Sequence, residues 1–203
     1  MRLYFDTCIV NDSFVLLETH SEDKLRPQDV KWPLERWILE YIALYYLLDL
    51  DDQRELEFGS SLVMHDELEN MRIRFPIARK KKCTMLQMYD LLVEKIIYYE
   101  LLPVPKSLLK EVSQVLPDRK DIEHVCQAVL GRWDYFITTD FHSILAHAKK
   151  LKPLGIVAVS PRAFVEGNFL TLEELVRTLH GSWISLEDVV KSWINEIKDS
   201  VMT

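Results

Sequence analysis

The stretch MRLYFDTCIV, residues 1–10, decides the fold, because an apolar run in it ends directly at Asp6. Residues 2–5 have the pattern of a strand buried on both faces, which is typical of parallel sheets. A carboxylate at the end of such a strand costs stability unless another group pairs with it or binds it. Asp6 therefore either ends the strand in a turn or belongs to a group of converging carboxylates.

Further short apolar strands alternate with helices along the chain. We expect strands at 2–5, 55–63, 134–139 and 155–160. Helices are expected at 33–50, 65–75, 82–101, 117–132 and 142–151, with Asp118 as an amino-terminal cap and Gly131 at a helix exit. This alternation indicates an α/β domain built on a parallel sheet of four to five strands flanked by helices.

The carboxy-terminal part of the chain predicts two more helices. Thr171 and Glu174 have capping-box spacing at the start of residues 171–181, and Gly181 suits the end. Residues 185–197 carry one apolar stripe, made of Leu186, Val189, Val190, Trp193, Ile194 and Ile197. We expect this stripe to cover the domain's own core; the alternative is an interface with a second subunit or a partner.

The composition is that of one ordinary globular domain, with 203 residues, 48% hydrophobic and 28% charged. The three cysteines are odd in number and widely spaced, which favours free thiols in a reducing cytosol. The longest uninterrupted apolar run, residues 41–48, is far too short to span a membrane, and no signal peptide is recognisable. We therefore expect a cytoplasmic protein.

Charge is distributed unevenly along the chain. The formal net charge is −7, yet residues 71–89 contain six basic residues and no acid. This segregation predicts a local basic face on an acidic body, suited to phosphate contacts, although a solvated helix end is an equally good interpretation. The basic residues are Arg72, Arg74, Arg79, Lys80, Lys81 and Lys82.

Four acids stand next to predicted strand–helix junctions: Asp6, Glu67, Asp121 and Asp140. Ligands of open α/β sheets bind outside the carboxyl ends of the strands, where we expect these side chains. Each acid alone has a simpler role, as a turn residue, a helix cap or a solvated side chain. Together they would repel one another, and Mg²⁺ or Mn²⁺, which prefer oxygen ligands, would relieve that repulsion.

In these motifs the sequence resembles the PIN domain family of metal-dependent ribonucleases. An apolar strand followed by Asp and a hydroxyl residue matches LYFDT, and a Glu early in the helix after strand two matches SSLVMHDEL. An Asp opening an apolar helix is similar to DIEHVCQAVL, and a strand followed by Thr and Asp is similar to YFITTDFHSI. GIVAVSPRAF resembles the closing strand and the turn after it. The resemblance covers residues 1–165 and departs from the family at Cys8, where Asn is frequent.

The resemblance implies a PIN-like three-layer fold over residues 1–165, followed by a helical extension over 166–203. It implies that the four acids ligate one or two divalent ions, and that RNA is cleaved to leave a 5′-phosphate and a 3′-hydroxyl. Thr7 and Thr139 would supply hydrogen bonds that support the ligating carboxylates.

We therefore expect a Mg²⁺- or Mn²⁺-dependent endoribonuclease with RNA as its substrate. The rival hypothesis is a PIN-like scaffold that no longer cleaves and binds RNA or a protein. A third hypothesis is a toxin masked by an antitoxin on the long helix or the tail. A second copy of the chain, an antitoxin or another protein are the partners to consider besides RNA; a membrane is not expected.

Overall fold

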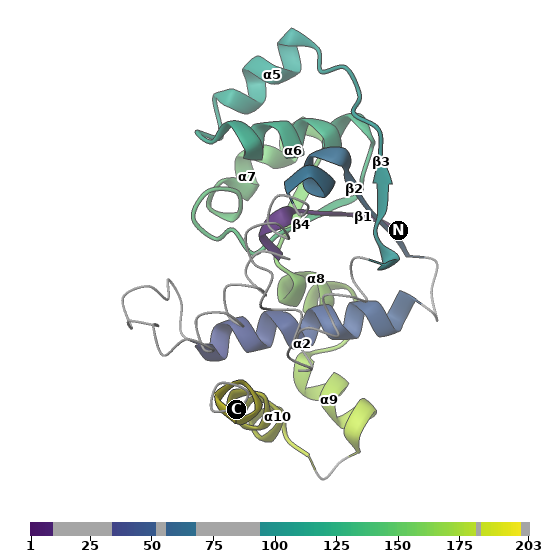
Figure 1. The fold of residues 1–203 in the computed structure, drawn as a ribbon, viewed down its shortest axis with the longest axis vertical. Coiled ribbons are helices and arrows are strands. Elements are labelled where there is room, and N and C mark those ends of the chain that lie inside the picture. Colours follow the sequence, from purple (N-terminus) through teal and green to yellow (C-terminus); the bar gives the residue numbers. More distant parts are fainter. Residues whose placement is uncertain (10–33, 52–55, 68–93, 182–183, 200–203) are drawn as a thin grey trace.

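The computed structural model describes residues 1–9, 34–51, 56–67, 94–181 and 184–199 (Figure 1). The fold is α/β, with five parallel strands in the order β3-β2-β1-β4-β5. The sheet therefore has the number and direction of strands that the sequence predicts. Its strands are β1 (Arg2–Phe5), β2 (Glu57–Ser61), β3 (Ile97–Tyr99), β4 (Tyr135–Ile137) and β5 (Val157–Val159).

The central strand β1 is buried on both faces, as its sequence predicts. Leu3 and Phe5 belong to one buried apolar cluster, and Tyr4, between them, belongs to another. This split follows from the period of two along a strand, which sends neighbouring side chains to opposite faces of the sheet. The two faces of the sheet therefore have separate cores.

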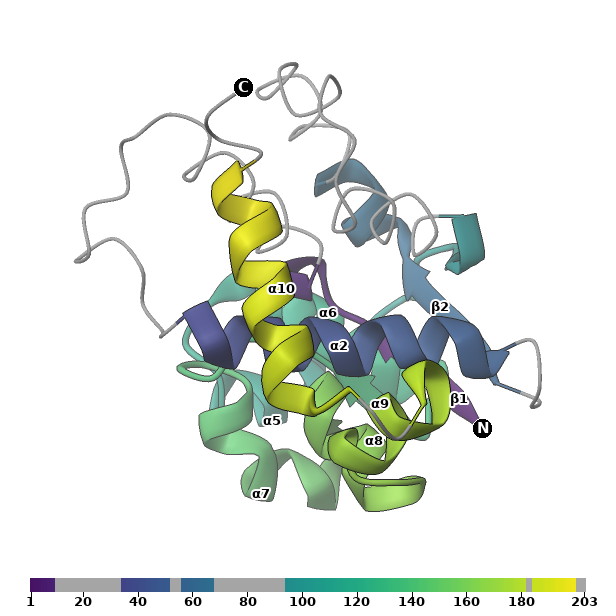
Figure 2. The same cartoon turned by 90° about the horizontal axis from the view of Figure 1, so that it is seen from below.

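Helices cover both faces of the sheet (Figures 1 and 2). The core that contains Leu3 and Phe5 is closed by α2 (Leu34–Asp51) and α8 (Pro161–Asn168), which pack against each other. The core that contains Tyr4 is closed by α5 (Lys106–Ser113), α6 (Arg119–Leu130) and α7 (Ala148–Leu151). The result is three layers with the sheet in the middle.

A carboxylate from α2 caps α8. Glu40 is buried, and its Oε2 accepts a hydrogen bond from the backbone N–H of Arg162 at 2.8 Å. Its Oε1 accepts from the hydroxyl of Ser160 at 3.0 Å. Ser160 is itself the amino-terminal cap of α8, because its side chain accepts from the N–H of Ala163. The two helices are thus joined by hydrogen bonds as well as by apolar contacts.

The carboxy-terminal helices lie on the outer side of α2 (Figure 2). They are α9 (Leu172–His180), which begins with the predicted Thr171–Glu174 capping box, and α10 (Leu186–Asp199). Five members of the predicted stripe pack against the core beneath α2: Leu186, Val189, Val190, Trp193 and Ile194. The apolar stripe therefore covers the chain's own core.

Two predicted helices differ from the structure, and two observed helices are absent from the prediction. Residues 82–101 were expected to form one helix, but Ile97–Tyr99 form the edge strand β3, paired with Gly59–Ser61 of β2. The expected helix 142–151 is broken, with 3₁₀ turns at Leu145–His147 and Lys152–Leu154 on either side of α7. Helices α5 and α8 were not expected at all. Of the helices expected at 65–75 and 82–101, residues 65–67 and 94–95 are helical, whereas 68–75 and 82–93 lie outside the described residues.

Helix α6 ends at Gly131, as the sequence predicts. Gly131 is its carboxy-terminal cap in a right-handed conformation, and the left-handed residue is Arg132, with φ 53°. A Cβ on Gly131 would lie 2.5 Å from the indole nitrogen of Trp133, so glycine is needed there for space.

Within the described part of the chain, we find no helix with the length and apolarity that crossing a membrane would require.

Candidate functional site

The candidate site lies where the strand order of the sheet reverses. From β1 the chain adds β2 and β3 on one side, and then β4 and β5 on the other. Open α/β sheets bind ligands at this switch point, outside the carboxyl ends of the strands on either side of it. Asp6 directly follows β1, and its N–H donates to the carbonyl of Ile137, the last residue of β4. Asp6 and the segment Thr138–Asp140 therefore flank the switch point.

Asp6 is 2% exposed, and Thr138 is its closest hydrogen-bond donor. The Thr138 hydroxyl donates to Oδ2 of Asp6 at 2.6 Å and accepts from the N–H of Asp140 at 3.0 Å. Burial raises the pKa of Asp6, and the Asp140 charge adds to this, whereas His124 and the Thr138 hydroxyl oppose it. The sequence directs attention to Thr139, which is also buried, and the structure adds Thr138, which joins the carboxylate of Asp6 to the backbone of Asp140.

Asp121 and Asp140 are linked by Ser143. Oδ1 of Asp140 accepts from the backbone N–H groups of His142 at 3.0 Å and Ser143 at 2.8 Å. The Ser143 hydroxyl in turn donates to Oδ2 of Asp121 at 2.5 Å. Asp140 therefore caps the turn that follows it, which is the simpler role considered for it. Its Oδ1 accepts both backbone hydrogen bonds, from His142 and Ser143.

Asp121 is held in the first turn of α6 by the predicted cap. The Asp118 side chain accepts from the N–H groups of Lys120 and Asp121 and so fixes the start of the helix. Burial raises the pKa of Asp121 to about 6, and the charges of Asp6, Asp140 and Asp118 contribute to this rise, while the Ser143 hydroxyl opposes it. Asp6, Asp121 and Asp140 are therefore close enough to repel one another.

Glu67 has a different environment from the three aspartates. It ends the described part of the helix at 62–67, and its Oε1 accepts from Nζ of Lys120 at 2.5 Å. Its Oε2 lies 3.2 Å from Nε2 of His124. Burial alone would raise the pKa of Glu67, but hydrogen bonds from His124, Lys120 and Thr7 outweigh it and lower the pKa to about 2. Glu67 is therefore ionised and paired within the protein.

His124 connects this site to the core of the sheet. It is 2% exposed, and its Nε2 also lies 3.2 Å from the hydroxyl of Thr7. Its Nδ1 lies 3.0 Å from the hydroxyl of Tyr4, which lies 2.8 Å from the hydroxyl of Ser61. Burial lowers the pKa of His124, but Glu67 and the charges of Asp6 and Asp121 outweigh it and raise the pKa. The charged imidazole is thus stabilised by the surrounding acids.

The three aspartates fit a hard divalent cation by the chemistry of their donors, because they offer only oxygen and the charges of their neighbours help to raise the pKa of Asp6 and of Asp121. Glu67 fits less directly, since Lys120 and His124 already neutralise it. Across the described residues, no three His, Cys, Asp or Glu side chains are arranged as a ready ligand group. The six basic residues expected to contact RNA lie outside the described residues.

Comparison with known proteins gave no match. Neither protein-family models, nor curated proteins, nor solved structures match this chain. The functional interpretation therefore rests on the residues of the site.

Several polar residues of the site were not predicted from the sequence. Lys120, Thr138 and Ser143 were not singled out, although each lies one to three residues from a predicted acid. Ser143 follows Asp140 by three residues, which is the spacing at which an Asp caps a turn. His124 follows Asp121 by three residues, a spacing that puts both on one helix face. That spacing is the signal in the sequence that points to His124.

Proposed function

We propose that this protein is a Mg²⁺- or Mn²⁺-dependent endoribonuclease whose acidic site is formed by Asp6, Asp121 and Asp140, with Glu67 beside them. The observation that carries the proposal is the gathering of the three aspartates at the switch point of a parallel sheet, where Thr138 joins Asp140 to Asp6 and Ser143 joins it to Asp121. Burial, together with the neighbouring charges, raises the pKa of Asp121 there to about 6. The resemblance of the surrounding motifs to PIN domains supports a PIN-like fold and RNA as the substrate. A cytoplasmic location is part of the same proposal.

The three aspartates would hold the cation, which when bound supplies a water of lowered pKa and stabilises charge on a phosphodiester. Thr138 and Ser143 keep Asp6 and Asp121 in position by donating to one oxygen of each. Glu67, with its pKa of about 2, accepts hydrogen bonds but does not donate a proton. The Lys120 side chain is 68% exposed, so its ammonium group is available to a phosphate of the substrate.

The basic residues between Arg72 and Lys82 remain our proposed contacts to the RNA backbone. Their charge is the largest local excess of positive charge in an otherwise acidic chain. Replacing Lys80, Lys81 and Lys82 together by Gln should weaken RNA binding at low salt and flatten its salt dependence, because fewer counterions are then released.

A scaffold without catalytic activity is the second candidate function, and one observation favours it. Lys120 and His124 together neutralise Glu67 within the chain, as a bound cation would in an enzyme. Such a protein would bind RNA or a protein partner without cutting. Binding without metal-dependent cleavage would distinguish it from the enzyme.

The test is cleavage of a mixed pool of single-stranded and structured RNA in Mg²⁺, in Mn²⁺ and in EDTA. The parent protein is compared with Asp6→Asn and Asp121→Asn, and with Glu123→Gln as the matched control. Glu123 is on the same helix as Asp121, and it forms an ion pair with Arg119 at 3.1 Å on the surface, away from the acidic site.

Metal-dependent cutting by the parent and by Glu123→Gln, lost in both aspartate variants, would establish the enzyme. RNA binding without cutting by all four proteins would favour the scaffold instead. Activity that persists in EDTA and in both aspartate variants would exclude the carboxylate site as the source of cleavage.

A further inference from the structure

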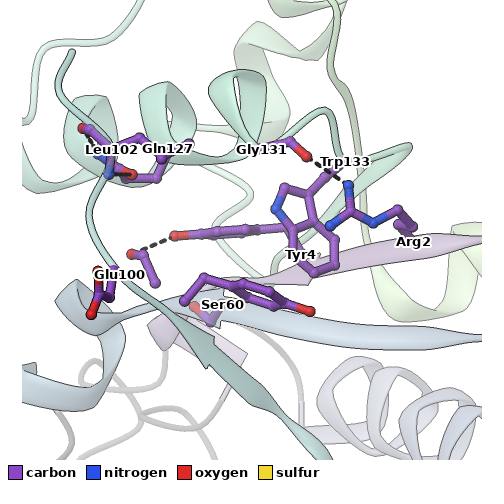
Figure 3. Close-up of a pocket in the computed structure, with 10 residues that line it drawn as sticks. Arg2, Tyr4, Ser60, Glu100, Leu102, Gln127, Gly131 and Trp133 are labelled. Atoms are coloured by element: carbon purple, nitrogen blue, oxygen red, sulfur yellow. Dashed lines mark hydrogen bonds between the residues drawn. The ribbon is translucent and has the colours of Figure 1, made fainter.

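A cavity of about 330 Å³ lies behind the candidate site, on the face of the sheet that α6 covers (Figure 3). Figure 3 shows the Tyr4 ring in the middle of the view. Gln127 of α6 and the nearby Leu102 lie on one side of the ring, and the strand that carries Ser60 lies on the other. The volume is within the range of small-ligand pockets, about 300–1,000 Å³. Its main lining residues are Tyr4, Ser61, Tyr99, Leu102, Gln127 and Trp133.

The aromatic wall of this cavity is held in a fixed position. Trp133 meets the rings of Tyr4 and Tyr99 edge to face, with centroids 5.9 Å and 5.4 Å away. The Arg2 guanidinium lies 4.3 Å above the Trp133 ring. A Cβ on Gly59 would lie 2.1 Å from Cη2 of Trp133, so the ring can approach the sheet only because that residue is glycine. The chain therefore maintains an aromatic wall of fixed geometry beside the cavity, in which Trp133 is nearly perpendicular to Tyr4 and to Tyr99.

The opposite wall carries the side-chain amide of Gln127, which can form further hydrogen bonds. Nε2 of Gln127 donates to the carbonyl of Leu102 at 2.9 Å, and its Oε1 accepts from the N–H of Leu102 at 2.8 Å. These two bonds leave one N–H and one acceptor site of the amide, on a side chain that is 7% exposed. The remaining N–H and the remaining lone pair point to different sides of the amide, and each has a defined direction because main-chain atoms hold the side chain.

We propose that this cavity binds a nucleobase, a proposal that rests on the ribonuclease function. A nucleobase is a flat ring, and aromatic side chains can contact any of the four bases. Its polar edge can form hydrogen bonds with a side-chain amide. Gln127 provides the amide, Tyr99 and Trp133 provide the rings, and the exposed Glu100 at the mouth can accept from an exocyclic amino group. Amino-bearing bases should therefore bind better than uracil.

The cavity connects to the candidate site through two buried side chains. Tyr4 lines the cavity, and its hydroxyl lies 3.0 Å from Nδ1 of His124. Nε2 of His124 lies 3.2 Å from Glu67. Tyr4 and His124 therefore stand between a base in the cavity and Glu67 of the candidate site. The base belongs either to the RNA substrate itself or to a free nucleoside that regulates cleavage.

The test is equilibrium dialysis of adenosine, cytidine, guanosine and uridine against the full-length protein in EDTA. Leu102→Trp places a large side chain at the mouth and keeps the bonds to Gln127, which use only main-chain atoms. Leu109→Trp is the matched control, because Leu109 is 45% exposed and Leu102 is 43% exposed. We expect Leu102→Trp to weaken binding of the amino-bearing nucleosides at least tenfold and Leu109→Trp to leave it unchanged.

Equal binding by the parent and Leu102→Trp would overturn the proposal, as would the absence of binding by any nucleoside at millimolar concentration. Glu100→Gln should reduce the preference over uridine, and an unchanged preference would remove Glu100 from the site. An oligoribonucleotide that displaces the nucleoside identifies the base as the substrate's own, whereas simultaneous binding identifies a free effector. Asp6→Asn should keep nucleoside binding, so failure of the nuclease proposal and failure of this one give different results.

Discussion

The burial of Asp121 and its repulsion by the neighbouring acids predict that Asp121→Asn stabilises the metal-free protein. Raising the pKa of Asp121 from 3.8 to about 6 corresponds to about 3 kcal/mol, at about 1.4 kcal/mol per pKa unit. The side chain is partly exposed, so solvent screening reduces this to about 2 kcal/mol. The helix amino terminus favours the carboxylate by about 0.3–1 kcal/mol. The net gain expected from Asn at neutral pH is therefore about 1 kcal/mol.

The sign of the pH dependence follows from the raised pKa. Between pH 3.8 and about 6 the folded chain keeps the Asp121 proton more often than the unfolded chain does. The free energy of unfolding of the parent therefore falls as the pH rises through this window. The Asn variant carries no charge at this position and does not lose stability in this way. The advantage of Asp121→Asn should be fully present at pH 7.5 and should shrink toward zero as the pH is lowered to 4.5.

Urea unfolding in EDTA at pH 4.5, 6.0 and 7.5 measures this difference, with Glu123→Gln as the control. Asn can still accept the hydrogen bond from Ser143, so the substitution changes charge more than shape. A variant less stable than the parent at pH 7.5, or an advantage that does not change with pH, would refute the reasoning. With millimolar Mg²⁺ the parent should gain more stability than the variant, because only the parent keeps all three carboxylates.

Three further predictions concern contacts that hold the site and the fold together. Thr138→Val removes the hydroxyl that donates to Asp6, and should lower the free energy of unfolding by about 1.5–3 kcal/mol; an unchanged urea midpoint would count against this contact. Gly59→Ala should cost about 1–3 kcal/mol by overpacking against Trp133, and adding Trp133→Phe should recover part of that loss, whereas additive losses would contradict the steric explanation. Thr171→Ala should lower the thermal midpoint by the equivalent of about 1 kcal/mol, since it removes a capping box; no shift in calorimetry would show that α9 does not depend on its cap.

Much of the sheet could be predicted because its strands are short apolar runs that end at polar residues. Strand β3 could not, because Ile97–Tyr99 continue an apolar pattern that suits a helix equally well, and two of the three side chains are exposed. Only pairing with β2 identifies it as a strand. The start of α8, by contrast, carries a recognisable signal: Ser160 caps it and Pro161 occupies its first turn.

The acids of the site could be predicted individually, but their partners could not. Asp6 and Asp140 follow strands, and that position is readable from the sequence. Strand alternation stops at Ile137, so it does not say whether Thr138 or Thr139 turns its hydroxyl toward Asp6. Burial of His124 depends on Tyr4 and Glu67, which are 120 and 57 residues away in the chain. Such contacts exist only once the sheet has formed.

The capping of α8 by Glu40 limits where the chain can be divided. The two ends of this contact, Glu40 and Ser160, are 120 residues apart, so both must be present in one fragment. A fragment that ends at residue 165, where the resemblance to PIN domains ends, stops inside α8 and removes α9 and α10 from α2. Its exposed apolar surface would favour aggregation. A protein produced for biochemical work on the acidic site should therefore include the chain through residue 199, the end of α10.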